Sequence, residues 1–328
     1  MRDLRLRMAK KNRVMKTEPA VYKLRFATST VAGSGGTGRF YVDLSQACSI
    51  VNRRFYRQGL RWGVAQIKIL SLIGNGSVTC RKAMNTWVVG GAWNKTMRKW
   101  LEQQNSAMES AGAQSAVAAF RDYKIFLDDE HVTDYLAAGN DLNATNLIPT
   151  DGAGAAFLAG EWEASQVVIP NDGAPGTTTE YLVKMHGPSD ANAKSVIGGY
   201  AFSRARPFSP DPQTPAVETS WLSTMQDVGD NQTEVVDNAI DKNDNLPYDA
   251  ANYPGSPGNG GTSYVHDTTF LTGTTVGGQS HLRGGEFPCG LMRFDVTNND
   301  STAKNIVIDI DLVPGPHRGY LAESMTDM

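Results

Sequence analysis

The sequence predicts an all-β protein, a β-sandwich with helices inserted in the loops between its strands. Segments in which apolar and polar residues alternate, many of them rich in β-branched side chains, follow one another along most of the 328 residues. The chain contains 33 Gly and 15 Pro, which favours many turns. Apolar residues make up 40% of it, which suffices for a substantial core in one large β domain or two smaller ones.

The first predicted elements lie between residues 21 and 89. Asp43 and its neighbours are suited to cap a short amphipathic helix over residues 46–58, which Gly59 ends. The Gly-Asn-Gly sequence at residues 74–76 predicts a hairpin turn between two long strands. The predicted strands of this part are residues 21–31, 39–44, 60–73 and 77–89.

The remainder of the chain is also strand-rich, with one exception. Residues 94–120 are rich in Ala, Gln, Glu and Met, which predicts one or two helices broken near Gly112. Residues 203–262 form a long stretch rich in Pro, Gly and Asp, and a loop of this length is usually functional or part of an interface. The other predicted strands are residues 123–127, 161–170, 180–186, 196–202, 264–271, 291–296 and 305–313.

Charge is distributed unevenly along the chain. Residues 1–100 contain 20 Lys and Arg against three acidic residues, a net charge of +17. Residues 101–328 contain 11 basic and 31 acidic residues, a net charge of −20. This asymmetry favours a polyanionic partner for one part of the molecule. The alternative is that folding mixes the two halves into a neutral surface.

Residues 1–20 are predicted to be a basic arm that precedes one folded domain over residues 21–328. A segment of this kind binds phosphates through charge neutralisation and counterion release. The Lys-Lys-Asn-Arg sequence at residues 10–13 also fits a short nuclear-import pattern. The alternative is a solvated chain end without a partner. The expected nucleic-acid-binding residues of the arm are Arg2, Arg5, Arg7, Lys10, Lys11, Arg13 and Lys16.

A second basic cluster begins in the predicted helix and ends in the strand after it. On a helix, Arg53 and Arg57 are i,i+4 neighbours, and Arg54 lies beside them. Guanidinium groups suit phosphates and aromatic rings stack on unpaired bases, so the cluster predicts a second nucleic-acid contact. Alternatively, the aromatic side chains belong to the core and the arginines pair with acids of a neighbouring subunit. The cluster comprises Arg53, Arg54, Arg57 and Arg61, interleaved with Phe55, Tyr56 and Trp62.

Several features count against catalysis, cofactors, metals and membrane insertion. The glycine-rich residues 33–38 have the spacing of a dinucleotide fingerprint, but a strand-like segment follows them where a helix is required. The five histidines have no metal-binding spacing, and no apolar run reaches 18 residues. Cys48, Cys80 and Cys289 are odd in number and widely spaced, which favours reduced, buried thiols. We therefore expect no enzyme, no cofactor, no metal and no membrane insertion.

Taken together, the basic arm, strand-rich body, helices between strands and long irregular loop resemble the single jelly-roll capsid proteins of small circular single-stranded-DNA (CRESS-DNA-type) viruses. The segments that carry this resemblance are the arm at residues 1–16, residues 57–70 and 77–90, and the terminal residues 304–320. The arm is shorter and less basic than the arms common in that group.

The resemblance implies a single jelly roll of eight main strands in two packed sheets. It also implies an icosahedral homo-oligomeric shell whose positively charged interior packages genomic nucleic acid, single-stranded DNA in that group. The acidic C-terminal two-thirds must then face outward. The expected location is the virion, with assembly in the host nucleus or cytoplasm. Two other classes stay open: a β-rich phage structural or receptor-binding protein, and a β-sandwich lectin or carbohydrate-active protein.

Overall fold

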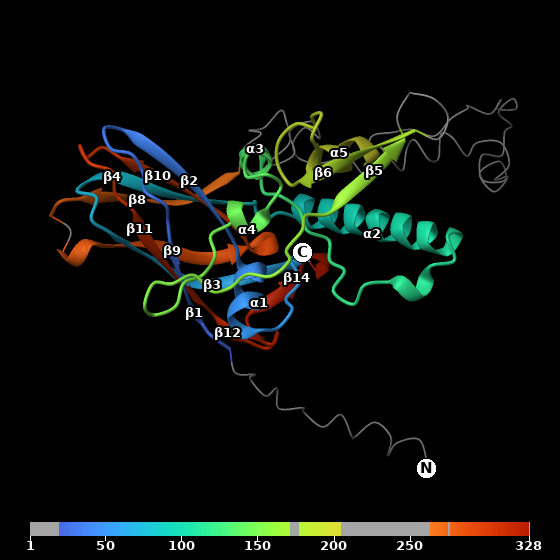
Figure 1. Cartoon of the computed structure of the whole chain (residues 1–328), viewed down its shortest axis with the longest axis horizontal. Helices are drawn as coiled ribbons and strands as arrows, with labels where there is room; N and C mark the ends of the chain where they lie inside the picture. The colour runs from blue at the N-terminus through green and yellow to red at the C-terminus, as the bar shows by residue number, and fades with distance from the viewer. Residues whose placement is uncertain (1–19, 171–176, 205–262, 275, 328) are drawn as a thin grey trace, which may run out of the picture.

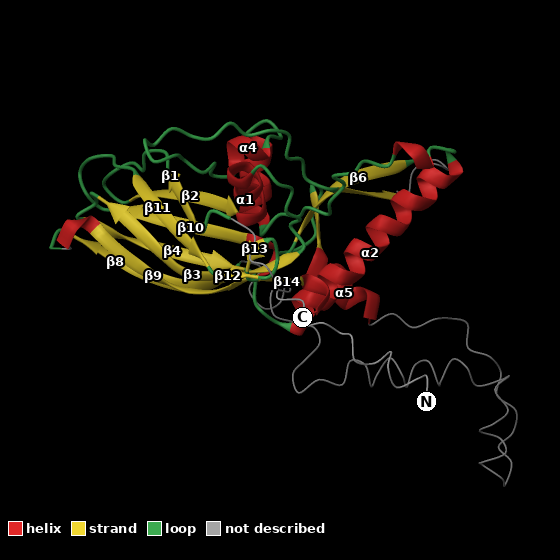
Figure 2. Cartoon of the chain, turned by 90° about the horizontal axis from the view of Figure 1, so that it is seen from below, coloured by secondary structure: helices red, strands yellow, loops and turns green. Residues whose placement is uncertain are grey.

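The structure, a computed structural model, describes residues 20–170, 177–204, 263–274 and 276–327. The chain is β-rich, and its curled antiparallel sheets form a β-sandwich with a helical flank at one end (Figures 1 and 2). The arm at residues 1–19 and residues 205–262 of the predicted long loop lie outside the described residues.

Two antiparallel sheets make the sandwich. The first contains, in order of pairing, β1 (Lys23–Ala27), β11 (Ile306–Leu312), β3 (Leu60–Ser71) and β9 (Gln279–Phe287). A short strand, β14 (Ala322–Ser324), pairs with the first residues of β3. The second sheet contains β2 (Gly36–Asp43), β10 (Leu291–Asn298), β4 (Asn75–Lys82) and β8 (Tyr264–Thr272).

The core between the sheets follows the alternation of the strands. Ile306, Ile308 and Ile310 of β11 are buried in it together with residues of both sheets. Asp309 is directed to the opposite face, as the alternation predicts, but it is also buried because Lys23 and Arg25 of β1 pair with it at 3.0 and 2.7 Å. The predicted β-sandwich therefore rests on the period of two in these strands.

The flank consists of α2 (Trp87–Ser110), α5 (Val196–Arg204) and a small sheet of β5 (Gln166–Pro170), β6 (Thr178–Lys184) and β7 (Ala193–Ser195). A second apolar cluster joins α2 to this sheet and to α5. The side chains of Trp100 and Gln103 on α2 donate hydrogen bonds to the main-chain oxygens of Gln166 and Val168, at 3.0 and 2.6 Å.

The remaining elements connect the strands. Asp43 accepts hydrogen bonds from the first amides of α1 (Leu44–Asn52), the predicted cap. A short hairpin follows β11 and returns the chain to β14. The other elements are α3 (Asp129–Ala137), α4 (Leu142–Thr145), β12 (Pro314–Gly315), β13 (Gly319–Tyr320), and the 3-10 turns Gln114–Ala116, Val276–Gly278, Pro288–Gly290 and Met325–Asp327.

The hairpin predicted at residues 74–76 is wrong, because β3 and β4 belong to different sheets. Gly76 pairs with Asn298 of β10, and a Cβ atom at this position would collide with the carbonyl oxygen of Thr297. Asp300 accepts the amide hydrogen of Gly74 at 2.8 Å. Gly76 therefore allows β4 and β10 to approach closely, and the segment around Gly74 carries the chain from one sheet to the other.

Two apolar segments predicted as strands are helical. The strand predicted at residues 77–89 ends at Lys82, and Trp87 begins α2, whose Val88 and Val89 are buried in the flank. The strand predicted at residues 196–202 is α5, and Ser195 accepts the amide hydrogen of Gly198 at 3.1 Å, as a helix-capping residue does. In both, tertiary burial of β-branched residues outweighs their strand propensity.

Two further strand predictions also differ from the structure. Residues 123–127 form no strand and make only an isolated bridge, between Phe126 and Lys184. Strand β9 lies outside the predicted strands, and a Cβ at its Gly284 would collide with the carbonyl oxygen of Ala65 on the neighbouring strand. The helix predicted at residues 94–120 is confirmed, although it begins earlier and ends at Ser110.

The three cysteines are buried and form no disulfide with one another, as predicted. Trp62, Trp93 and Trp100 lie in apolar clusters, whereas Trp87 is 40% exposed.

Candidate nucleic-acid interface

The predicted arginine cluster lies mostly in a loop. Helix α1 ends at Asn52, and Arg53 adopts a left-handed conformation with φ 54°. The amide of Tyr56 donates to the hydroxyl of Ser49 at 2.9 Å, and the Tyr56 ring is buried in the core. The helix predicted over residues 46–58 therefore ends early, because the chain must turn to bury Tyr56. Arg53 and Arg57 are not neighbours on a helix.

Buried polar contacts hold this loop in place. The Gln58 side chain donates to Asp43 at 3.1 Å and accepts the amide hydrogen of Ile125 at 2.6 Å. The hydroxyl of Tyr56 donates to the carbonyl oxygen of Arg318 at 3.2 Å. Because Tyr56 and Gln58 are buried, the intervening Arg57 is directed to the surface, where it is exposed.

A cavity of about 480 Å³ lies over the loop and brings together three guanidinium groups, which we call the arginine pocket. Arg54 and Arg57 come from the predicted cluster. Arg318 comes from the turn between β12 and β13, where it has a φ of 49°, and its guanidinium donates to the carbonyl oxygen of Phe55 at 2.6 Å. The pocket is lined by Arg54, Phe55, Arg57, Leu60, Ala119, Phe120, His317 and Arg318.

Aromatic side chains do accompany the arginines, but not those that the sequence indicated. Tyr56 and Trp62 belong to the core. Phe55 is partly buried, and its ring meets that of Phe120 edge to face at 5.3 Å, while the Arg57 guanidinium lies 5.5 Å from its centroid. Phe120 is 69% exposed, so its ring is available to stack on an unpaired base.

Two arginines of the cluster lie outside the pocket. Arg53 donates to the carbonyl oxygen of Leu158 at 3.3 Å. Arg61, on β3, forms ion pairs with Glu323 and, at 3.4 Å, with Glu286. Arg61 therefore pairs with acids of its own chain, whereas the predicted alternative placed such acids on a neighbouring subunit.

Ion pairs neutralise much of the charge asymmetry among the described residues. Basic side chains of the first hundred residues pair with acids from later in the chain, as one of the two readings of the sequence predicted. The pairs are Lys23 and Arg25 with Asp309, Arg39 with Asp134, Arg57 with Asp122, Arg61 with Glu286 and Glu323, Arg81 with Asp295, and Lys99 with Glu102. The Arg57 pair is loose, at 3.9 Å, so Arg57 keeps much of its capacity to bind an anion.

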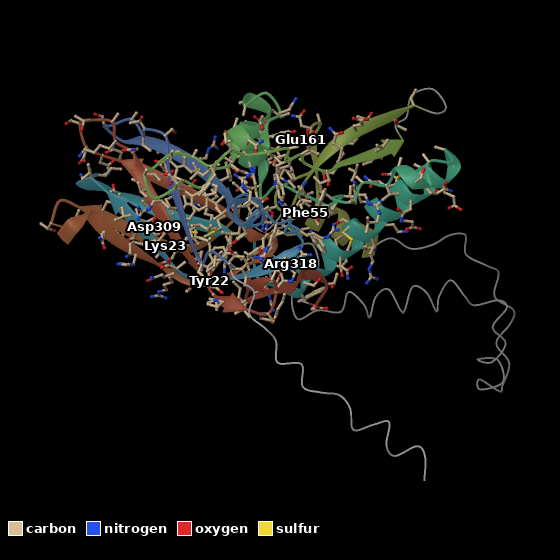
Figure 3. All side chains as sticks on the ribbon, turned by 60° about the horizontal axis from the view of Figure 1, so that its bottom comes forward. Tyr22, Lys23, Phe55, Glu161, Asp309 and Arg318 are labelled. Carbon is tan, nitrogen blue, oxygen red and sulfur yellow. The ribbon has the colours of Figure 1, made fainter. Side chains whose placement is uncertain are left out.

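The predicted basic arm, with all seven of its basic residues, lies outside the described residues. Its point of attachment is described. The amide of Val21 donates to Asn52 at 3.0 Å, and the hydroxyl of Tyr320 donates to the carbonyl oxygen of Val21 at 2.6 Å. Val21 is thus held by residues close in sequence to Arg54 and Arg318 of the arginine pocket, and Figure 3 labels its neighbour Tyr22 together with Arg318.

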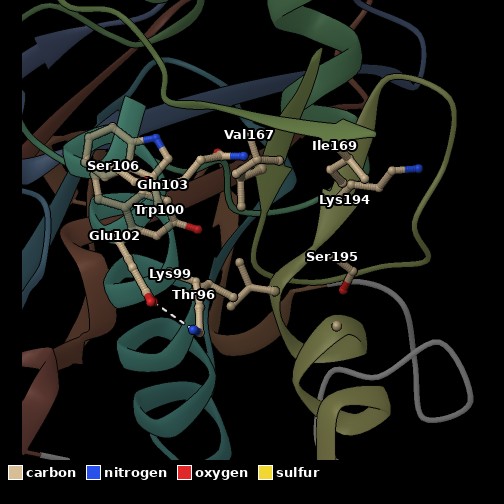
Figure 4. A pocket seen from close by; sticks show the side chains of 14 residues that line it. Thr96, Lys99, Trp100, Glu102, Gln103, Ser106, Val167, Ile169, Lys194 and Ser195 are labelled. Carbon is tan, nitrogen blue, oxygen red and sulfur yellow. Dashed lines mark hydrogen bonds and ion pairs between the residues drawn. The ribbon is translucent and has the colours of Figure 1, made fainter. Parts of the chain in front are cut away.

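Another groove lies between α2 and the small sheet (Figure 4). Its volume is about 570 Å³, and its walls are largely apolar. Lys99 forms an ion pair with Glu102 at 2.7 Å, and Lys194 lies 3.8 Å from the centroid of the Tyr181 ring. The cations of this groove are thus engaged within the flank.

No group of three or more His, Cys, Asp or Glu side chains in the described ranges is arranged to hold a metal ion. None of the described helices combines the length and the apolar composition that crossing a lipid bilayer requires.

Comparison of the chain with protein-family models, curated proteins and solved structures gave no match.

Proposed function

We propose that the chain is a viral coat protein of the single jelly-roll type, which assembles into a closed icosahedral shell and packages nucleic acid, single-stranded DNA in our reading. In this proposal the arginine pocket and the basic arm face the cargo inside the virion. Assembly takes place in the host nucleus or cytoplasm.

The order of strand pairing supports the jelly roll. In chain order the eight sandwich strands are β1, β2, β3, β4, β8, β9, β10 and β11. The first pairs with the eighth, the second with the seventh, the third with the sixth and the fourth with the fifth. Such nested pairing is that of one long hairpin folded over into two sheets, and jelly rolls recur in viral capsids and in lectins.

The arginine pocket favours a coat protein over a lectin, because a fold by itself does not assign a function. Three guanidinium groups beside an exposed phenylalanine suit a phosphate backbone with unpaired bases. A neutral sugar carries no negative charge that three clustered cations would neutralise. The observation that carries the proposal is that Val21, which follows the predicted arm, is hydrogen-bonded to Asn52 and Tyr320, close in sequence to Arg54 and Arg318 of the pocket.

Assembly is tested on the purified full-length protein by sedimentation and electron microscopy. We expect closed particles of uniform diameter, because a closed symmetric assembly of identical subunits has a defined size. A sharp monomer at micromolar concentration and physiological salt would contradict the proposal.

Cargo binding is tested by deleting residues 1–16, which removes a net charge of +6 and none of the described strands. We expect the shortened chain to fold and to co-purify with less nucleic acid, which salt then strips more easily. Equal nucleic-acid content in both proteins would show that the arm is not a binding element.

A further inference from the structure

A second cavity, of about 300 Å³, adjoins the arginine pocket, and Arg57 and Leu60 line both. Its other walls are mainly apolar and aromatic, so we call it the aromatic pocket. Its volume is at the lower end of the range of small-molecule sites, about 300–1,000 Å³. The residues that define it here are Trp93, Met97, Trp100, Leu101, Asp122 and Tyr123.

The aromatic walls of this pocket pack against one another and against the surrounding chain. The Tyr123 ring lies 6.0 Å from that of Trp93 and 5.4 Å from that of Trp100, centroid to centroid. The indole of Trp100 is fixed by its hydrogen bond to Gln166. A Cβ at residue 59 would collide with the Trp93 ring, so Gly59 is what allows Trp93 to pack against the loop that carries Arg57.

Asp122 lies where the two pockets meet. Its side chain is 5% exposed, and one carboxyl oxygen accepts the amide hydrogen of Gln58 at 2.9 Å. The other oxygen lies 3.9 Å from the nearest Arg57 nitrogen, beyond hydrogen-bonding distance. Burial raises the pKa of Asp122, while the Gln58 amide, Lys124 and Arg57 act in the opposite direction. A carboxylate that is almost buried thus keeps acceptor capacity next to an open cavity.

We propose that the aromatic pocket takes one unstacked base of a single strand whose phosphates occupy the arginine pocket, and that Asp122 selects guanine. The inference rests on the proposed function and deepens it. Guanine presents two adjacent donors, N1–H and the N2 amino group, to a carboxylate. Thymine presents one N–H between two carbonyl oxygens, which the carboxylate repels. The guanidinium groups next to the cavity fit the phosphates on either side of the inserted base.

The experiment uses the purified full-length protein and three labelled DNA octamers at one salt concentration. The octamers are all-thymidine, thymidine with one central guanine, and thymidine with one central abasic site. We expect the guanine octamer to bind on the order of tenfold more tightly than either of the others, by fluorescence anisotropy. Equal affinity for all three octamers would overturn the guanine pocket.

Two variants locate the effect. Asp122→Asn keeps an oxygen for the Gln58 amide but replaces the other oxygen by an amino group, so the guanine preference should be lost while the abasic octamer still binds. Met97→Trp fills the cavity and should reduce the affinity for the guanine octamer to that for the abasic one. Glu102→Gln removes a charge from the same helix, where it pairs with Lys99, and should change neither affinity nor preference.

The outcomes separate the pocket from the proposed function. If the wild type binds all three octamers equally and salt weakens this binding, the proposed nucleic-acid binding stands and the guanine pocket fails. If no octamer binds at any salt concentration, the nucleic-acid proposal itself fails. A guanine preference that persists unchanged in both Asp122→Asn and Met97→Trp would place base recognition elsewhere and overturn the inference. Thermal melting verifies that each variant is folded.

Discussion

Arg293 and the arginines of the pocket have the same side chain in opposite surroundings. Arg293, on β10, is 9% exposed and pairs with Asp128, Glu130 and Asp295 at 2.9, 3.1 and 2.7 Å. Arg57 and Arg318 are exposed, and their guanidinium groups contact main-chain oxygens, together with the loose Asp122 pair of Arg57. Main-chain oxygens orient a guanidinium without neutralising it. The comparison separates arginines that hold the fold together from arginines that remain able to bind an anion.

The ion pair between Arg293 and Asp128 belongs to a larger network of buried hydrogen bonds. Ser263 donates to Asp128 at 2.8 Å, and Asp128 also accepts the amide hydrogen of His131. The His131 ring stacks on Tyr41, with centroids 4.0 Å apart, and hydrogen-bonds Asn146 at 3.0 Å. Since Nδ1 of His131 accepts the amide hydrogen of Leu127, the ring is neutral, with its proton on Nε2.

The largest effect is expected for Arg293→Met. This change leaves Asp128 buried without its guanidinium partner and should lower the free energy of unfolding by about 3–5 kcal/mol. Urea denaturation measures it. The matched control, Arg318→Met, removes an exposed guanidinium and should cost less than about 1 kcal/mol. Equal losses for the two variants would remove the distinction between the two kinds of arginine.

The second-largest effect is expected for acid, which should lower the free energy of unfolding through the buried His131. Burial lowers the pKa of His131 from 6.5 to about 4. The unfolded chain therefore binds a proton at this residue below about pH 6.5, whereas the folded chain binds it only near pH 4. The contribution of His131 to the free energy of unfolding is fully present above pH 6.5. It is lost as the pH falls towards 4, by about 3 kcal/mol in total.

The variant His131→Asn isolates this contribution, because it retains an acceptor for the Leu127 amide and does not titrate. Urea denaturation of both proteins between pH 7 and pH 4 should show a smaller loss for the variant. Burial raises the pKa of Asp43, which acts in the opposite sense in both proteins, so the difference between them reports His131. Parallel curves would mean that His131 does not govern the acid response.

Changes to the arginines of the pocket should affect the binding of nucleic acid and leave the stability of the fold unchanged. Replacing Arg54, Arg57 and Arg318 together by Gln should lower the affinity for single strands and reduce the slope of log K against log salt by about two units, roughly 0.7 for each phosphate contact. The melting temperature should change little, because Gln keeps part of the stem that covers apolar surface. Arg61→Gln is the control, since Arg61 already pairs with acids, and its salt slope should equal that of the wild type.

The smallest effect is expected at the thiols. Cys48, Cys80 and Cys289 are free and buried, and burial raises the pKa of each. A reducing agent should leave the melting temperature unchanged, and a thiol reagent should label all three residues only after denaturation. A drop in melting temperature on reduction would reveal a disulfide.

Predictions from the sequence succeeded where a residue's environment is set by its immediate neighbours. The strands of the sandwich bury every second residue, so β11 and β3 are visible in the sequence. Val196 and Ile197 are buried by α2 and the small sheet instead, and their β-branched side chains gave the wrong element. In the site, Arg54 and Arg57 were found because they are close in sequence. Phe120 and Arg318 lie far from them along the chain, and no local pattern connects these residues before folding does.

The two hydrogen bonds from α2 to β5 limit the kinds of contact that another protein molecule can make with the small sheet. Strand β5 is the last of its sheet, and the oxygens of Gln166 and Val168 are main-chain acceptors that a further strand would use. The side chains of Trp100 and Gln103 already donate hydrogen bonds to both oxygens, so α2 covers this edge of the sheet. Neighbouring molecules cannot extend the sheet there by β-augmentation. A contact at the β5 edge therefore depends on side chains, whose shape and charge select a partner more strictly than a row of main-chain groups does.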